Sequence, residues 1–181
     1  MDYFEVLKTS QEPEPEQPAG EYRAHTPLPL PAANDVDATV AYIEQTCAGL
    51  YFTSDSDEPV VLYRLLGDGL QTLEGRADKL ALPSASAFAT FVAGGAAASE
   101  PGFVSERRPV GDFFARLCSQ QTSERQRHLA ASLEAVFEHL GTQAGADAAY
   151  YRVGIAPDIE VYVVMLVDGQ VVGIKTLSVE T

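Results

Sequence analysis

The chain has 181 residues and a formal net charge of −14 at pH 7. This length suggests one domain with additional segments, and a hydrophobic content of 46% is enough to build a core. With 26 acidic residues against 12 basic ones, the chain lacks the basic footprint that direct nucleic-acid binding requires. The imbalance suits a basic protein partner, and it is equally typical of an ordinary acidic bacterial protein kept soluble by its charge.

The chain shows no targeting or membrane segment. No apolar run approaches the roughly 20 residues of a membrane helix, and the N-terminus lacks the basic-then-apolar pattern of a signal peptide. We therefore expect a cytoplasmic protein without membrane contact. Cys47 and Cys118 match no metal-binding spacing and lie at apolar positions of helical patterns, so we expect buried free thiols.

Prolines divide the chain into two parts. Six of the eleven prolines lie within the first 32 residues, in the stretches EPEPEQP and TPLPLP. Proline at this density blocks helix and sheet and favours extended polyproline II. We predict an acidic, proline-rich flexible tail over residues 1–33 and a folded domain over residues 34–181.

The first half of the domain reads as a helix followed by strands. Asn34 is a suitable N-cap, and Gly49 ends the helix. One apolar face recurs at helical spacing, through Val36, Val40, Ile43 and Cys47. Residues 53–59 predict a loop with solvated charges. A strand over residues 60–66 and a second near residues 70–73 then flank a glycine-rich turn.

Three further helices follow in the predicted order. Ser84 caps a helix over residues 85–92, whose inward side chains we predict to be Phe88, Phe91 and Val92. Pro109 suits the first turn of the next helix, which carries Phe113, Phe114 and Leu117. Ser123 and Gln126 form a capping box, and Gly141 is predicted to end the last helix.

The end of the chain predicts the centre of a sheet. A strand over residues 150–155 precedes two apolar runs, residues 159–167 and 171–179, that flank an Asp168-Gly169 turn typical of a hairpin. Because these runs are apolar at nearly every position, both faces of the sheet must be buried. We predict an α+β fold with a mainly antiparallel central sheet covered by helices on both sides.

No catalytic pattern is present, so we predict that the protein is not an enzyme. His128 and His139 lie in one predicted helix about three turns apart, and His25 lies in the tail. The sequence contains no nucleophile elbow, no phosphate-binding loop and no zinc motif. Asp55 and Asp57 alternate as in a calcium loop, but the glycine and the glutamate that such a loop requires are missing.

Three stretches of the domain resemble the sugar-non-specific nuclease inhibitor family of the nuclease A inhibitor type. Residues 49–59, GLYFTSDSDEP, are similar to the family's D-G-L-L-F-x-S-E-S-E-x-P. Residues 113–116, FFAR, resemble its F-F-S-R, and residues 151–181 resemble its closing Y-R-L-G through V-E-T. The three stretches occur in the family's order.

The resemblance implies a small three-layer α/β/α sandwich that inhibits a metal-dependent nuclease degrading DNA and RNA. It implies that Asp55 contacts a basic residue of the nuclease and that Gln121 matches a glutamine of the interface. We predict Asp57 and Glu180 as further partner-binding residues. The resemblance further implies that Thr181 reaches the catalytic metal. The protein would have no cofactor of its own, and a divalent cation such as Mg²⁺ would bridge a one-to-one complex of the monomer with the nuclease.

The sequence also departs from the family. The family has glutamate where Asp55 stands, and it carries a tryptophan near the position of Ser123, whereas this chain contains no tryptophan. Large aromatic anchors often dominate interfaces. The alternative hypothesis is therefore an acidic protein-interaction module that has the same fold but no longer inhibits a nuclease.

Overall fold

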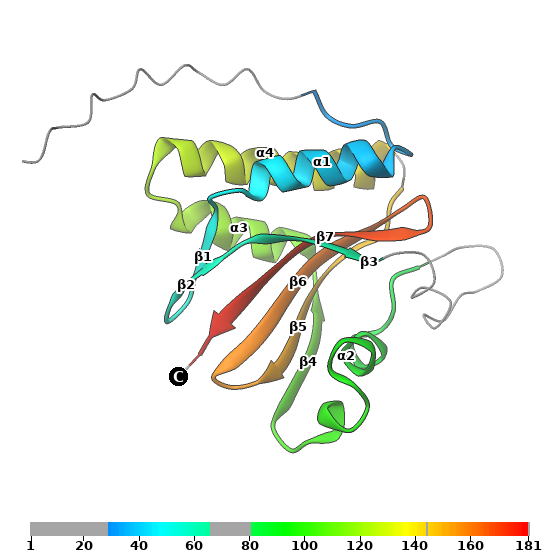
Figure 1. Ribbon diagram of the computed structural model, residues 1–181, viewed down its shortest axis with the longest axis vertical. Helices are drawn as coiled ribbons and strands as arrows, with labels where there is room; N and C mark the ends of the chain where they lie inside the picture. The colour runs from blue at the N-terminus through cyan, green and yellow to red at the C-terminus, as the bar shows by residue number, and fades with distance from the viewer. Residues whose placement is uncertain (1–28, 66–80, 144, 181) are drawn as a thin grey trace, which may run out of the picture.

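A five-stranded antiparallel sheet organises the computed structural model, which describes residues 29–65, 81–143 and 145–180 (Figure 1). The helices are α1 (Val36–Cys47), α2 (Ala85–Ala93), the short 3-10 helix η2 (Ala97–Ser99), α3 (Val110–Gln120) and α4 (Glu124–Gln143). The strands are β1 (Tyr51–Thr53), β2 (Asp57–Pro59), β3 (Val61–Leu65), β4 (Phe103–Arg108), β5 (Ala148–Ile155), β6 (Asp158–Val167) and β7 (Gln170–Val179). The strand order of the large sheet is β3-β7-β6-β5-β4.

The predicted terminal hairpin is confirmed as the pair β6–β7. Asp168 and Gly169 both have positive φ angles, 45° and 74°, which is the geometry of the tight turn that matches the twist of paired strands. Val167 pairs with Gln170, and the register runs unbroken to Asp158 opposite Val179. β6 and β7 therefore form the centre of the sheet, with β3 and β5 on their outer sides.

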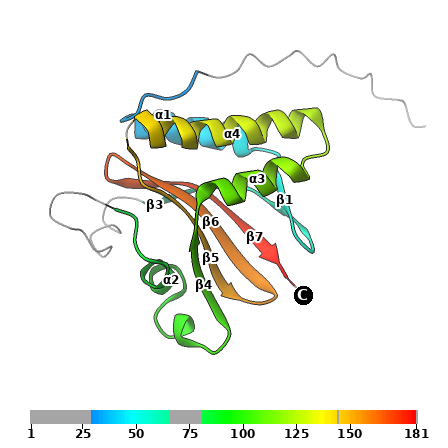
Figure 2. The same ribbon diagram turned by 180° about the vertical axis from the view of Figure 1, so that it is seen from behind.

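Side chains of the central strands alternate between two cores. Tyr150, Val161 and Val163 pack under α1, α3 and α4, whereas Tyr151 and Tyr162 pack against α2 on the other face. Figure 2 shows the molecule from behind, with α2 on the opposite side of the sheet from the other three long helices. This arrangement explains why β6 is apolar at nearly every position, and it confirms the predicted α+β sandwich.

The structure corrects three helix details. Asp35, not Asn34, is the N-cap of α1, because its side chain accepts a hydrogen bond from the Ala38 N–H at 2.9 Å. Phe91 is 36% exposed, because the buried side of α2 lies between Phe88 and Ala89, about 110° around the helix from it. α4 also continues past Gly141, since a single glycine costs a helix only about 1 kcal/mol.

Other predictions meet the structure only in part. Cys47 is buried and Cys118 half-buried, and both are free thiols whose pKa is raised, mainly by burial.

Most of the predicted tail, and the predicted strand near residues 70–73, lie outside the described residues. None of the helices in the described ranges is long and apolar enough to cross a bilayer.

Candidate partner-binding site

The acidic stretch after α1 forms a small β-hairpin, so the predicted loop over residues 53–59 is partly wrong. Tyr51 pairs with Pro59 and Thr53 with Asp57. At the end of this pairing the Thr53 hydroxyl donates to Asp57 Oδ1 at 2.8 Å, which narrows the turn that follows. The serines on either side of Asp55 also bond across the turn, since the Ser54 N–H donates to the Ser56 carbonyl at 2.9 Å. Asp55 therefore lies at the tip of an ordered hairpin.

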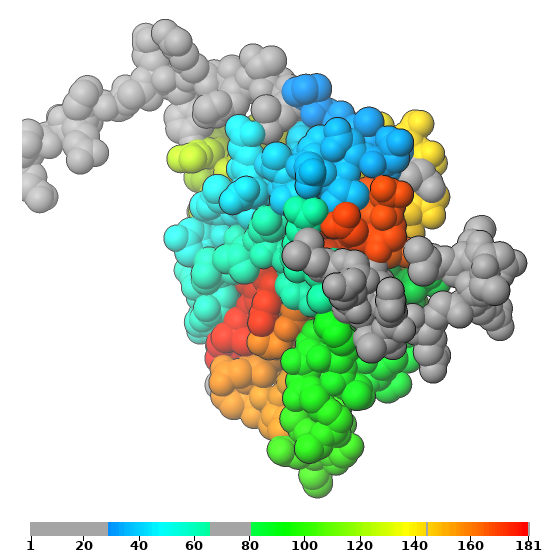
Figure 3. Space-filling view, turned by 45° about the vertical axis from the view of Figure 1, so that its right-hand side comes forward, coloured from blue at the N-terminus to red at the C-terminus, as the bar shows by residue number. Residues whose placement is uncertain are grey.

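The hairpin tip is bonded to the end of β7. The Asp55 N–H donates to the Val179 carbonyl at 3.0 Å, and the Val179 N–H donates to Ser54 Oγ at 2.8 Å. In the space-filling view the end of β7 lies between the hairpin and the turn that joins β5 to β6 (Figure 3). Two stretches that are far apart in the sequence thus form one continuous edge of the molecule.

Glu180 is held by contacts on both its backbone and its side chain. Its N–H donates to the Pro157 carbonyl at 2.8 Å, and its carboxylate accepts hydrogen bonds from Ser178 Oγ at 2.9 Å and from Arg152. The Arg152 side chain is only 12% exposed and also binds the Glu106 carboxylate at 2.9 Å. An ion network across β4, β5 and the end of β7 therefore fixes the last described residue.

From this network we predict that Glu180 stabilises the folded protein to an extent that depends on pH. Burial alone raises the pKa of Glu180, but hydrogen bonds from Arg152 and Ser178 outweigh it, so the pKa lies below the usual value for glutamate. The stabilisation is therefore complete above the unfolded-state pKa of about 4.3 and disappears as the pH falls through the lower folded-state pKa. We expect Glu180→Gln to lower the melting temperature at pH 7 and to lower it by less at pH 3. An equal difference at both pH values would contradict this assignment.

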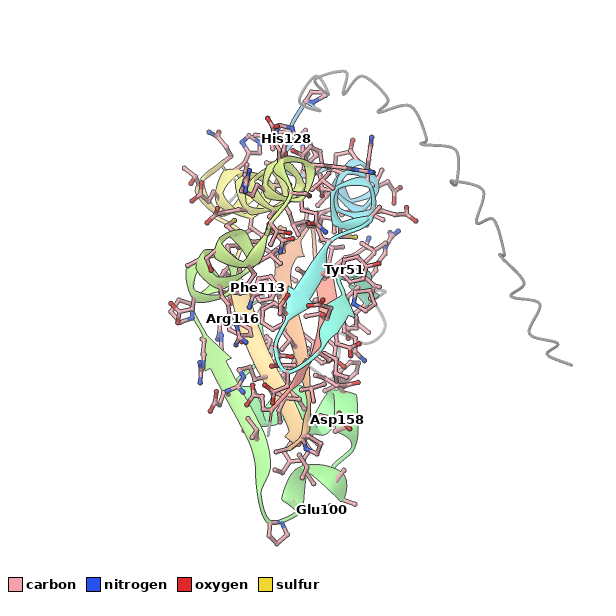
Figure 4. The ribbon with its side chains drawn as sticks, turned by 90° about the vertical axis from the view of Figure 1, so that its left-hand side faces the viewer. Tyr51, Glu100, Phe113, Arg116, His128 and Asp158 are labelled. Carbon is pink, nitrogen blue, oxygen red and sulfur yellow. The ribbon has the colours of Figure 1, made fainter. Side chains whose placement is uncertain are left out.

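Helix α3 holds the other side of the hairpin. Arg116 and Gln120 are four residues apart, so both project from the face of α3 that meets β1. The side-chain amide of Gln120 bonds both the N–H and the carbonyl of Thr53, as a neighbouring strand would. Arg116 donates to the same carbonyl at 3.2 Å and lies over the Phe52 ring, 4.7 Å from its centroid. Figure 4 shows α3, with Arg116, beside the hairpin that carries Tyr51.

A polar hollow opens where the hairpin meets the junction of α3 and α4. It has a volume of about 400 Å³ and is lined by Tyr51, Thr53, Asp57, Gln120, Gln121, Thr122 and Gln126. Gln121 is only 7% exposed and donates from Nε2 to the carbonyls of Tyr51 and Leu117, both at 3.0 Å. Gln121 is thus part of the wall of this hollow, and it does not project from the surface.

The structure brings most of the predicted contact residues to one edge. Asp55 and Glu180 flank Val179, Asp57 lies at the base of the hairpin turn, and Gln121 lies behind it. Thr181 lies outside the described residues, and its metal contact stays a prediction. The described residues include no group of three or more His, Cys, Asp or Glu side chains that could hold a metal ion.

Sequence reasoning missed the residues that hold this edge together. Arg116 belongs to a motif that carried the family resemblance, and its spacing of four from Gln120 was a readable sign of a shared helix face. Arg152 also lies in a stretch that carried the resemblance, but no spacing connects it to its partners Glu106 and Glu180, which are far away in the sequence. Only the strand order reveals that these three side chains meet.

Comparison with known proteins gives a family match over most of the chain. A family model described as nuclease A inhibitor-like protein matches residues 37–181. The match covers well over half of the chain and includes the β1–β2 hairpin, the α3–α4 junction and β7. A search of curated proteins gave no match.

Proposed function

The chain belongs to the nuclease A inhibitor-like family, and from this premise we propose that it inhibits a sugar-non-specific, metal-dependent nuclease by binding over the active site. In this proposal the acidic hairpin and the end of β7 make the contact. The protein performs no chemistry itself and acts by excluding the nucleic-acid substrate. The expected complex contains one copy of each protein.

The observation that carries the proposal is the pair of hydrogen bonds between the hairpin tip and Val179. These bonds keep Asp55 and Glu180 in a constant relation, so a partner meets a preformed acidic edge. Preorganisation reduces the entropy lost on binding. Asp55, at the exposed tip, is the proposed contact to a basic residue of the nuclease, and the overall charge of −14 favours rapid encounter with a basic active-site cleft.

Thr181 is the proposed contact to the catalytic metal of the nuclease. The hydroxyl oxygen of a threonine is a suitable ligand for Mg²⁺. A ligand at an open position of the metal would displace substrate phosphate or water. The bonds of Val179 and Glu180 support this proposal, because they give the following residue a firmly held point of attachment.

The proposal is tested by titrating the full chain against a purified sugar-non-specific nuclease, with DNA and with RNA as substrates, in the presence of Mg²⁺. We expect complete inhibition of both activities at a one-to-one ratio. Unchanged hydrolysis at a large excess of the chain, together with no complex in size-exclusion chromatography, would favour the alternative of a non-inhibitory interaction module. The absence of tryptophan and the inward position of Gln121 are the features that favour that alternative.

A chain extended beyond Thr181 tests the metal contact separately. Appending three residues such as Gly-Ser-Gly is expected to weaken inhibition by about a hundredfold or more, since the added backbone would collide with the metal site. The melting temperature should stay unchanged, because the added residues follow the last strand. Equal inhibition by the native and extended chains would refute the metal contact without refuting inhibition itself.

A further inference from the structure

We propose that the polar hollow between the β1–β2 hairpin and the α3–α4 junction receives a basic side chain, an arginine guanidinium, from the partner protein. This inference rests on the proposed function for the identity of the partner. It adds a contact in which a side chain of the partner enters this protein. The hairpin tip projects toward the nuclease, whereas the hollow accepts a side chain that projects from it. With a volume of about 400 Å³ it is many times larger than a water molecule, which occupies about 30 Å³.

An available acceptor in the wall is the first observation that indicates a ligand. Gln121 is only 7% exposed, and its Nε2 donates to two backbone carbonyls. Two carbonyls can be bonded only by the amide nitrogen, so Nε2 faces them and the oxygen Oε1 is the other amide atom. Oε1 accepts no hydrogen bond from the described residues. Among the described residues, Ser105 Oγ is the only fully buried side-chain oxygen or nitrogen without a partner, so Gln121 Oε1 is open to solvent in the hollow. A donor brought by the partner would replace solvent at this oxygen.

The charge of the wall determines which kind of donor fits. Asp57 is the only ionisable carboxylate in the lining, and the Tyr51 side chain beside it is 45% exposed, so its ring is accessible to a cation. A guanidinium has five donors in a plane and stacks on aromatic rings while it bonds a carboxylate. Asp57, Gln121 and Tyr51 together offer the three kinds of contact that this group uses.

Nearby positive groups do not reverse this preference. Arg116 and Arg127 lie beside the hollow but are not part of its lining, and each donates to a backbone carbonyl, of Thr53 and of Thr122 respectively. The C-terminal end of α3 favours a cation in the hollow and the N-terminal turn of α4 disfavours it, and these helix-dipole effects are of similar size. The Asp57 carboxylate therefore determines that the hollow prefers a cation over an anion.

The hollow can be tested in the free protein, without any nuclease. We would titrate the ¹⁵N-labelled full chain with ethylguanidinium chloride and follow the side-chain amide signals of Gln121 and Gln126. Saturable shifts in the millimolar range are expected, and they should be lost in Asp57→Asn but kept in Glu138→Gln. Glu138 is an exposed acid near the far end of α4, so its substitution matches the change of charge. Sodium chloride serves as the control for ionic strength.

Two further probes, one neutral and one anionic, decide which kind of group the hollow binds. Propionamide and sodium propionate should not give saturable shifts of the same signals. Equal binding of propionamide would show that the hollow takes a neutral amide, and binding of propionate would show that it takes an anion; either result overturns the proposal. The absence of any saturable shift with ethylguanidinium, or shifts that persist in Asp57→Asn, would overturn it as well.

A plugged hollow tests its use in the complex. Thr122→Phe places an aromatic ring at the rim and should weaken inhibition of a sugar-non-specific nuclease by about tenfold to a hundredfold. Thr142→Phe, at another exposed threonine near the end of α4, is the matched control and should leave inhibition unchanged. Inhibition that is equally strong in both variants would show that no partner side chain enters the hollow. If the native chain inhibits no nuclease, the proposed function fails, whereas the ethylguanidinium titration still decides the chemistry of the hollow.

Discussion

Replacing Asp55 by lysine is expected to weaken nuclease inhibition by at least about a hundredfold. Removing one partner of a close interfacial charge pair costs about 2–5 kcal/mol, and every 1.4 kcal/mol is a factor of ten. Reversal of the charge adds repulsion against the same basic residue. The hairpin should stay folded, because the bond from position 55 to Val179 uses the backbone N–H. Inhibition constants measured over a range of salt concentrations check the prediction.

The control for Asp55→Lys is Glu138→Lys, an exposed acid on α4 far along the chain from the hairpin. Both substitutions change the net charge equally, so they lower the long-range attraction to a basic partner by a similar amount. We expect the control to reduce the association rate slightly and to leave the dissociation rate unchanged. An equal loss of inhibition in the two variants would mean that Asp55 acts only through overall charge and makes no specific contact.

Replacing Gly173 by alanine is expected to be the most destabilising single-methyl change in β7. A Cβ at this position would lie 2.0 Å from the Val163 carbonyl oxygen and 2.7 Å from the Val164 Cα, both on the paired central strand. The neighbours are backbone atoms and cannot rotate away, so the sheet itself would have to shift. We expect a loss of about 3 kcal/mol, or roughly 10 °C in melting temperature for a chain of this size.

Gly141→Ala provides the matched comparison for Gly173→Ala. Gly141 lies inside α4, and a Cβ there would meet nothing within 4 Å. The same methyl group should therefore raise the free energy of unfolding by about 0.5–1 kcal/mol, because alanine loses less backbone entropy in a helix. Thermal unfolding of both variants checks the pair. Similar melting temperatures for the two proteins would show that β7 tolerates more movement than its register suggests.

Elements whose signals are local were predictable from the sequence. The Asp168-Gly169 turn, the Ser84 cap and the Ser123 cap each depend on residues within a few positions of one another, and all are present. Of the predicted capping box, the bond from the Gln126 N–H to Ser123 Oγ forms, whereas the Gln126 side chain accepts from the Ser123 hydroxyl. The burial of both sheet faces followed from the continuous apolar run of β6. Errors arose where two neighbours were equally suitable, as for Asn34 and Asp35, or where a short helix had an ambiguous inner side, as for Phe91.

The candidate site, like the fold, was predictable from the sequence only in part. The acidic stretch around Asp55 and the apolar runs of the terminal strands were visible as patterns, and a resemblance connected them to one family. Their physical connection was not visible, because it consists of two hydrogen bonds between Val179 and the hairpin tip, across more than a hundred residues. Gln121 was predicted as a partner contact, but its burial makes it a wall of the hollow.

The sequence by itself determined the kind of elements, the two-sided sheet and the acidic character of this protein, because spacing and composition act over short distances. Tertiary structure alone decided that the hairpin tip, the end of β7 and the α3–α4 junction share one edge. It also decided that Arg152 joins Glu106 to Glu180 and that Asp57 and Gln121 line a common hollow. These features depend on strand order and helix placement, which arise from the packing of the whole chain and leave no periodic pattern in the residues involved.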